Sequence, residues 1–186
     1  MILLTTSHRP TRRIRSLCND LTRSIPNSVR VNRGKMNFFD VAAKAIELGT
    51  NKFVVVDRWK GGPGRIRFFK VMDGEIKEVA PRLYVSGVKL RREFGTSREE
   101  VRRVFRKVFL DMDEMGDEEI GKLASKLSEF FELPALKKSE ARTLKYEAYL
   151  RIAKGEDFWA YLSFHILPSN MEVGPRIKIS HVVWQV

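Results

Sequence analysis

Apolar and polar positions along the first 50 residues follow patterns that predict short buried strands and amphipathic helices. Residues 2–6 form an apolar run typical of a buried strand. From Ile14 to Ile25 the apolar residues recur every three to four positions, which predicts a helix with Pro10 in its first turn. The polar face of that helix carries Arg12, Arg15, Asn19 and Arg23. A strand over 28–31 and a second helix after Asn37, with Asp40 completing a capping box, are expected next.

Residues 52–90 have the period of strands. The pattern predicts strands over 52–59, 65–72 and 81–90, with a glycine turn at 61–64 and a tight turn at Asp73-Gly74. The first part of the chain therefore has the order β-α-β-α-β-β-β.

Residues 97–186 predict two helices followed by three strands. Residues 97–100 (SREE) form a capping box, and they open a helix whose apolar face runs from Val101 to Phe109. A second helix is expected from Ile120 to Phe131, and strands over 144–152, 158–166 and 176–186. We expect an α/β fold of two lobes, one of about 1–92 and one of about 93–186, with the boundary near the charged segment 91–97.

Positive charge is concentrated in the first three-fifths of the chain. The net charge is +12 over 186 residues; residues 1–110 carry 25 Lys and Arg against 10 acids, whereas residues 111–186 carry 10 against 13. A lopsided basic surface is typical of a polyanion binder. The alternative, a charged thermophile surface, would mix both signs.

The chain lacks the usual signs of export, membrane insertion and catalysis. No apolar run has the length of a spanning helix, the N-terminal residues lack the order of a secretory signal, and Cys18 has no partner for a disulfide, so we expect a cytoplasmic protein. The three histidines are far apart, and Lys122 stands where a calcium loop starting at Asp111 needs a glutamate. We expect no metal, no cofactor and no enzyme; a catalytic pair assembled from distant residues is the remaining alternative.

Two basic segments favour nucleic acid as the partner. The first 35 residues hold eight Arg and Lys against Asp20. Around the glycine turn, Trp59, Phe68 and Phe69 interleave with Arg58, Lys60, Arg65 and Arg67. Basic groups with aromatics can follow a single strand and stack its bases, although each aromatic alone is better explained as a core residue. No DNA-binding motif occurs, which favours RNA.

Three motifs resemble the Brix domain family. Residues 5–11 (TTSHRPT), which lead into an Arg-rich helix, are similar to the opening of that family, and residues 32–35 (NRGK) resemble its pattern at the second helix. Residues 172–176 (EVGPR) followed by a strand are similar to its Gly-Pro-Arg signature. The chain, little longer than the domain, resembles a compact archaeal form and reads as a single Brix domain over 1–186.

The resemblance implies a ribosome biogenesis factor that binds precursor ribosomal RNA, assists rRNA processing and subunit assembly, and works with ribosomal proteins or other assembly factors. It also implies two similar lobes, each like the anticodon-binding domain of class II aminoacyl-tRNA synthetases. The alternatives are a module that bridges ribosomal proteins, and a tRNA-binding accessory domain. The residues we expect to contact RNA are Arg9, Arg12, Arg13, Arg15, Arg33, Lys35, Arg58, Lys60, Arg65, Arg67, Gly174, Pro175, Arg176 and Lys178.

Overall fold

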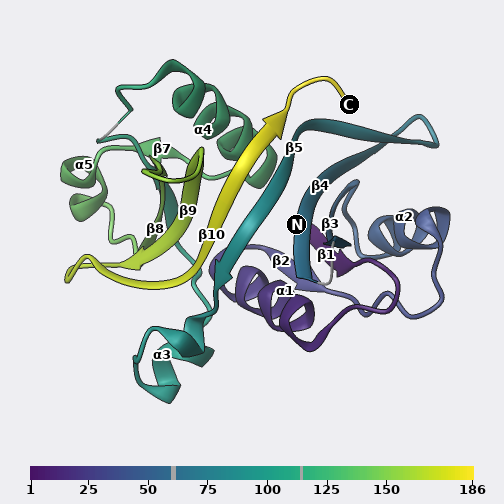
Figure 1. Cartoon of the computed structure of the whole chain (residues 1–186), viewed down its shortest axis with the longest axis horizontal. Helices are drawn as coiled ribbons and strands as arrows, with labels where there is room; N and C mark the ends of the chain where they lie inside the picture. The colour runs from purple at the N-terminus through teal and green to yellow at the C-terminus, as the bar shows by residue number, and fades with distance from the viewer. Residues whose placement is uncertain (60–61, 114) are drawn as a thin grey trace.

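The computed structural model describes residues 1–59, 62–113 and 115–186, and its framework is a ten-stranded mixed sheet (Figure 1). The order of strands across the sheet is β2-β1-β3-β4-β5-β10-β9-β8-β6-β7. The first half contains β1 (Ile2–Thr6), α1 (Arg12–Ser24), β2 (Ser28–Arg30), α2 (Phe38–Glu47), β3 (Lys52–Trp59), β4 (Gly62–Met72) and β5 (Glu75–Lys89). A connection with a 3-10 turn, η1 (Arg91–Glu93), and α3 (Arg98–Arg102) follows. The second half contains β6 (Val108–Asp111), α4 (Glu118–Phe131), β7 (Ala135–Leu136), α5 (Lys138–Thr143), β8 (Ala148–Lys154), β9 (Ala160–Ile166) and β10 (Met171–Val183).

The two halves repeat one topology. In the first half β1 pairs in parallel with β2 and β3, and β3, β4 and β5 form an antiparallel meander. In the second half β6 pairs in parallel with β7 and β8, and β8, β9 and β10 form the same meander. The last strands of the halves, β5 and β10, pair antiparallel at the centre. The predicted mixed α/β class is thus confirmed, with the strands of both halves in one continuous sheet.

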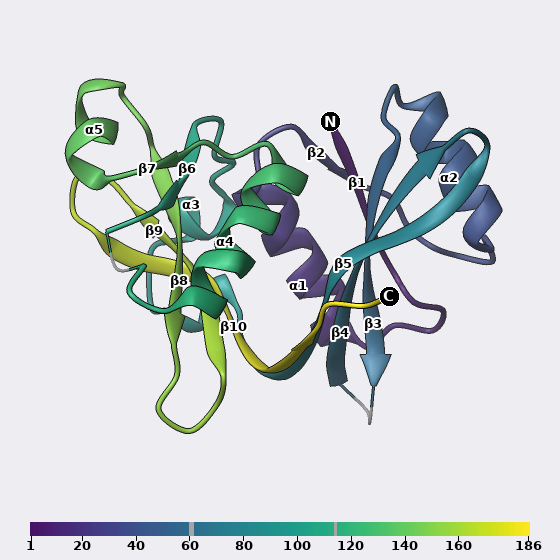
Figure 2. The ribbon, with the colours of Figure 1, turned by 90° about the horizontal axis from the view of Figure 1, so that it is seen from above.

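Helices cover the two faces of the sheet unequally. Helices α1 and α4 lie between the two arms of the sheet and share one large core with its inner face (Figure 2). On the outer face, α2 packs on Leu3, Phe53 and Phe69 in one arm, and α5 packs on Phe109 and Tyr149 in the other. Between these two smaller cores, none of the helices in the described ranges covers the outer face of β5 and β10 (Figure 1).

Local sequence signals determine where the first helices begin. The Thr11 side chain caps α1 by accepting from the Ile14 amide at 3.3 Å, so Pro10 lies just before the helix rather than in its first turn. The capping box of Asn37 and Asp40 at α2 is confirmed, with both hydrogen bonds at 2.9 Å. These caps satisfy amides that the helices leave without partners.

The prediction of one long helix from Ser97 to Phe109 is wrong. Helix α3 ends at Arg102 because Arg103 is extended, and the Phe105 amide then donates to Arg23 O at 2.8 Å. Residues 108–111 form β6, a buried strand between β7 and β8. An apolar run buried on both faces fits helical spacing as well as strand spacing, so only the parallel partners decide its structure.

Several elements differ from prediction in their bounds, and two were not predicted. Strand β5 begins at Glu75 rather than Pro81, directly after the predicted Asp73-Gly74 turn. The short strand β7 and helix α5 were not predicted, since two and six residues carry too little periodicity.

Within the described ranges, no helix is both long and apolar enough to cross a membrane.

Candidate nucleic-acid interface

The polar face of α1 and the turns beside it present exposed cations. Arg9, Arg12, Arg15 and Lys35 are exposed, as their sequence context predicted. The Arg15 guanidinium also donates to Pro10 O at 3.0 Å, which holds the chain at the start of α1. This part of the molecule therefore offers several arginines at its surface, each able to form paired bonds to phosphate.

The same face of α1 continues into a cleft of about 230 Å³ between α1, η1 and α3. Residues that line it include Ser16, Asn19, Arg23, Arg92 and Arg102. Its acid, Asp20, is buried and accepts from the Arg91 amide at 2.9 Å. Burial raises the pKa of Asp20, partly offset by that bond and by nearby arginines. The cleft combines three arginines with two neutral polar side chains, a set suited to a phosphate group.

Sequence reasoning missed the arginines of this cleft that come from η1 and α3. Arg92 and Arg102 lie far from α1 in the sequence, and only folding brings them together. The basic composition of residues 98–107 was visible, but it was assigned to the flanks of a long helix that does not form.

A fully buried arginine builds the wall behind the cleft. Arg91 donates through Nη1 to Arg103 O at 2.6 Å and through Nε to Gly174 O at 3.2 Å. Its guanidinium lies 4.5 Å from the Phe105 ring centre. Burial lowers the pKa of Arg91 to about 10, which leaves it charged at neutral pH. Arg91 thus joins α1, α3 and β10.

Several predicted RNA contacts are instead engaged within the protein. Arg13 forms a paired ion pair with Glu93 at 2.7 and 2.9 Å. Arg67 pairs in the same way with Asp57. These bonds fix the two guanidinium groups and neutralise part of their charge. The main role of Arg13 and Arg67 is therefore to hold segments of the protein together.

Arg33 was expected to contact RNA, and its burial corrects that prediction. Only 4% of it is exposed, its Nε donates to Met36 O, and its guanidinium lies 4.6 Å from the Phe38 ring centre. Burial lowers its pKa, as expected for a cation taken from water. Arg33 holds the turn before α2 and presents no charge to the surface.

The glycine turn was expected to combine cations with stacking aromatics. Arg58 is exposed, while Arg65 lies 3.4 Å from the Asp57 carboxylate. Lys60 and the Trp59 side chain lie outside the described residues. Phe68 and Phe69 are buried in separate cores, which confirms that each is a core residue. The turn therefore keeps its basic character without these two rings.

The Gly-Pro-Arg segment lies at the start of β10. Gly174 and Pro175 are buried, and Gly174 has a φ of +71°, where an added Cβ would lie 2.3 Å from the Phe94 ring. Arg176 is half-buried and ion-pairs with Glu172, whereas Lys178 is exposed. Gly174 and Pro175 therefore shape the backbone, and the two cations provide the charge.

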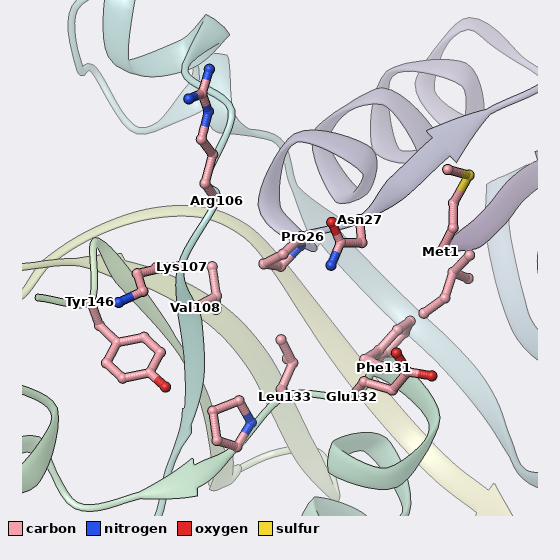
Figure 3. A pocket seen from close by; sticks show the side chains of 12 residues that line it. Met1, Pro26, Asn27, Arg106, Lys107, Val108, Phe131, Glu132, Leu133 and Tyr146 are labelled. Atoms are coloured by element: carbon pink, nitrogen blue, oxygen red, sulfur yellow. The ribbon is translucent and has the colours of Figure 1, made fainter. Parts of the chain in front are cut away.

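A cavity of about 190 Å³ lies where the halves meet at the start of β1 and β6 (Figure 3). Pro26 and Asn27 follow α1, and Leu133 and Pro134 follow α4, so equivalent segments of both halves line it. Lys107 is a charged residue of this lining, but its ammonium donates to Leu144 O at 3.0 Å. The lining mixes apolar side chains with the charged residues Arg106, Lys107 and Glu132, and the cavity lies apart from Arg12 and Arg15 at the start of α1. In the described part of the chain, no group of three His, Cys, Asp or Glu side chains could hold a metal ion.

Comparisons with known proteins agree on one group of relatives. The chain is 43% identical over 95 residues to a probable Brix domain-containing ribosomal biogenesis protein of Thermococcus kodakarensis; this covers 51% of the chain and 45% of the relative. The chain thus matches less than half the length of that relative. A protein of the same name from Pyrobaculum aerophilum is 26% identical over 99% of this chain and 96% of its own length. No family model matches the chain.

Solved structures extend the likeness to the whole fold. A probable ribosomal biogenesis protein from Aeropyrum pernix aligns with a TM-score of 0.77 and 26% identity over 96% of this chain and 94% of that one. The archaeal Imp4-like protein Mil shares the fold, with a TM-score of 0.69, 20% identity, and coverage of 98% and 99%. The resemblance carried by the three sequence motifs is therefore confirmed, and the chain is a homologue of the archaeal Brix domain-containing proteins.

Proposed function

We propose that the chain is a cytoplasmic ribosome biogenesis factor that binds precursor ribosomal RNA and assists rRNA processing and subunit assembly. In this proposal it has no catalytic activity of its own. The names of its relatives support the biological role. The basic surface supports RNA as the partner, because phosphate contacts supply most of the sequence-independent affinity for nucleic acid.

The continuous basic face of α1 carries this proposal. Arg12 and Arg15 are exposed at one end of the helix, and Arg23 meets Arg92 and Arg102 in the cleft at the other. The neighbouring acid, Asp20, is buried, accepts from the Arg91 amide and lies 3.9 Å from the Arg23 guanidinium, so it offsets part of the charge of Arg23 and leaves Arg12 and Arg15 unpaired with it. A row of cations along a helix can follow a phosphate backbone.

The predicted contact residues divide into two roles in this proposal. The exposed ones contact phosphate directly: Arg9, Arg12, Arg15, Lys35, Arg58 and Lys178. Arg13, Arg65, Arg67 and Arg176 have partners in the protein and add to the local positive potential. Gly174 and Pro175 shape the strand that carries Arg176.

We propose further that the lobes of about 1–92 and 93–186 are two copies of one unit similar to an anticodon-binding domain. The repeated strand order supports a shared unit. The likeness to synthetase domains rests on the family resemblance.

RNA binding by the purified chain over a range of salt concentrations tests the function. We expect binding to precursor rRNA fragments with a log–log salt slope of about −4 to −5, for about six neutralised phosphates. Crosslinking in the source cells, followed by sequencing, should enrich precursor rRNA at discrete sites. Recovery of ribosomal proteins without direct RNA crosslinks would contradict the proposal, and a preference for tRNA would favour an accessory tRNA-binding domain.

A protein partner is the second candidate. Phe39 is 74% exposed and Ile46 53% exposed on the outer side of α2, away from the core. Exposed apolar residues on one helix are typical of protein contacts. This observation favours a ribosomal protein or another assembly factor as a partner in addition to RNA.

A further inference from the structure

The outer face of the central strands combines cations with aromatic rings, a combination that the sequence did not reveal. We propose that this strip stacks unpaired RNA bases. It consists of Tyr84, Lys89, Phe94, Phe158, Tyr161, Arg176, Lys178 and His181. This inference rests on the proposed RNA binding and identifies unpaired nucleotides as the ligand of this surface.

The strip is exposed because the core side chains of the same strands point the other way. Leu83, Ile177 and Ile179 belong to the large core under α1 and α4. Tyr84 and Lys178 therefore lie on the outer face. A bulge between Ile179 and His181 shifts the alternation, and the His181 ring comes to the same face as Tyr84.

The rings form two aromatic groups along β10. Tyr84 and His181 stack with ring centres 4.2 Å apart and planes 13° apart. Phe158 and Tyr161, from the β8–β9 hairpin and β9, lie 6.3 Å apart in an edge-to-face arrangement. Both groups are at least partly exposed, so a base can reach a ring from outside.

Cations lie beside these rings. The Lys178 ammonium is 4.8 Å from the Phe158 ring centre, and the Lys89 ammonium is 4.4 Å from that of Phe94. The Arg176 guanidinium lies 5.7 Å from the Tyr161 ring centre. Lys89, Arg176 and Lys178 also line a hollow of about 380 Å³ with Ser86 and Gly87. A phosphate in the hollow would have both a charge partner and a ring for its base within reach.

Three carboxylates of this face pair with arginines. Glu172 binds Arg176, Asp57 binds Arg67, and Glu78 binds Arg82 at 2.7 Å. None of these three carboxylates pairs with Lys89 or Lys178. The two lysines therefore give the strip a net positive charge. Such a surface attracts a polyanion along its whole length.

Shape favours single strands over duplexes. The bases of a duplex are stacked on each other, whereas unpaired bases can stack on protein rings. Figure 2 shows the β8–β9 hairpin extending past β5 and β10 on one side. A single strand lying along β10 would pass beside this hairpin.

Fluorescence anisotropy with the full chain tests the proposal, using a labelled uridine decamer and an RNA duplex of equal charge. We expect Phe158→Ala and His181→Ala each to weaken decamer binding about tenfold, within the range for loss of one base–aromatic stack. The salt slope should not change, because neither substitution removes a cation. Phe158→Tyr should bind as wild type, since it keeps the ring.

Phe39→Ala is the matched control, because it removes an exposed phenylalanine from α2 on a different part of the surface. It should leave decamer binding unchanged, and thermal unfolding should show that all variants fold. Wild-type affinity in both alanine variants, or an equal loss on the duplex, would overturn the stacking site and leave the proposed function standing. A wild-type chain that binds neither RNA would overturn the proposed function itself.

Discussion

Helices α1 and α4 occupy equivalent places in the two halves but differ in the charge of their exposed faces. Each connects the first two strands of its half and packs on the same large core. The first turn of α1 has no acid, and its exposed face carries Arg12 and Arg15; the first turn of α4 has Glu118 and Glu119. Because apolar spacing determines how the helices pack, their solvent faces are free to differ. The repeated fold therefore says little about function, and the difference in charge says much more.

The charge of the whole chain follows the same division. Residues 1–110 carry 25 Lys and Arg against 10 acids, and residues 111–186 carry 10 against 13. Arg176 and Lys178 belong to the acidic part of the sequence but lie on β10, paired with β5 of the basic half. The paired central strands β5 and β10 thus extend the basic surface across the junction of the two halves.

The largest effect is expected where the two halves are joined. Arg91→Ala would leave Gly174 O and Arg103 O without their buried donor, and each such loss costs about 1–3 kcal/mol. We expect the free energy of unfolding to fall by about 3 kcal/mol or more in urea denaturation. Arg92→Ala, its exposed neighbour, should change it by no more than about 0.5 kcal/mol. Equal stability of the two variants would show that Arg91 does not hold the junction.

Removing two positive charges from α1 or from α4 should separate the roles of these equivalent helices in RNA binding. Arg12→Gln with Arg15→Gln on α1 should weaken binding about 50-fold at 0.1 M salt and flatten the log–log slope by about 1.4–1.8, for two lost phosphate contacts. Lys122→Gln with Lys126→Gln on α4 removes the same charge from the other half and should change binding little. Similar losses in both variants would mean that only net charge matters.

Local signals allowed the first half to be predicted almost completely. Caps at Asn37 and the apolar period of α1 act within a few residues, so they can be identified in the sequence. Strand β6 was missed because its three apolar residues and Asp111 are too few to show a period of their own, and its parallel partners come later in the chain. With β6 misassigned, the repeat between the halves could not be recognised.

The candidate site could be predicted only where it lies on one helix. Arg12, Arg15 and Arg23 share a face of α1, as the helical spacing indicated. The burial of Arg33 depends on Phe38 folding over it, and the stack of Tyr84 on His181 joins strands from opposite halves. Such contacts arise from tertiary structure and have no local sequence signal.

The caps of the equivalent helices should differ in strength. Thr11 accepts one amide bond, from Ile14 at 3.3 Å, and Thr11→Ala should cost about 0.5–1 kcal/mol. Asp117 accepts from two amides of α4 and also binds the Lys154 ammonium at 2.6 Å. We therefore expect Asp117→Ala to lower the urea midpoint more than Thr11→Ala does. The reverse order would indicate that the charge at α4 adds nothing to its cap.

The smallest expected effect is a pH dependence of stability from one buried histidine of the second half. His165 is buried and stacks on Tyr149 with ring centres 5.0 Å apart. Burial lowers the pKa of His165, opposed by its contact with Asn170 O and by Glu172. The unfolded chain takes up a proton as the pH falls through about 6.5 while the folded state resists it, so the free energy of unfolding should decrease below that pH. His165→Phe keeps a ring on Tyr149 and removes the titration, so its stability should vary less between pH 7 and about 5. A wild-type chain that gains stability on acidification through this window would show that His165 becomes protonated in the folded state.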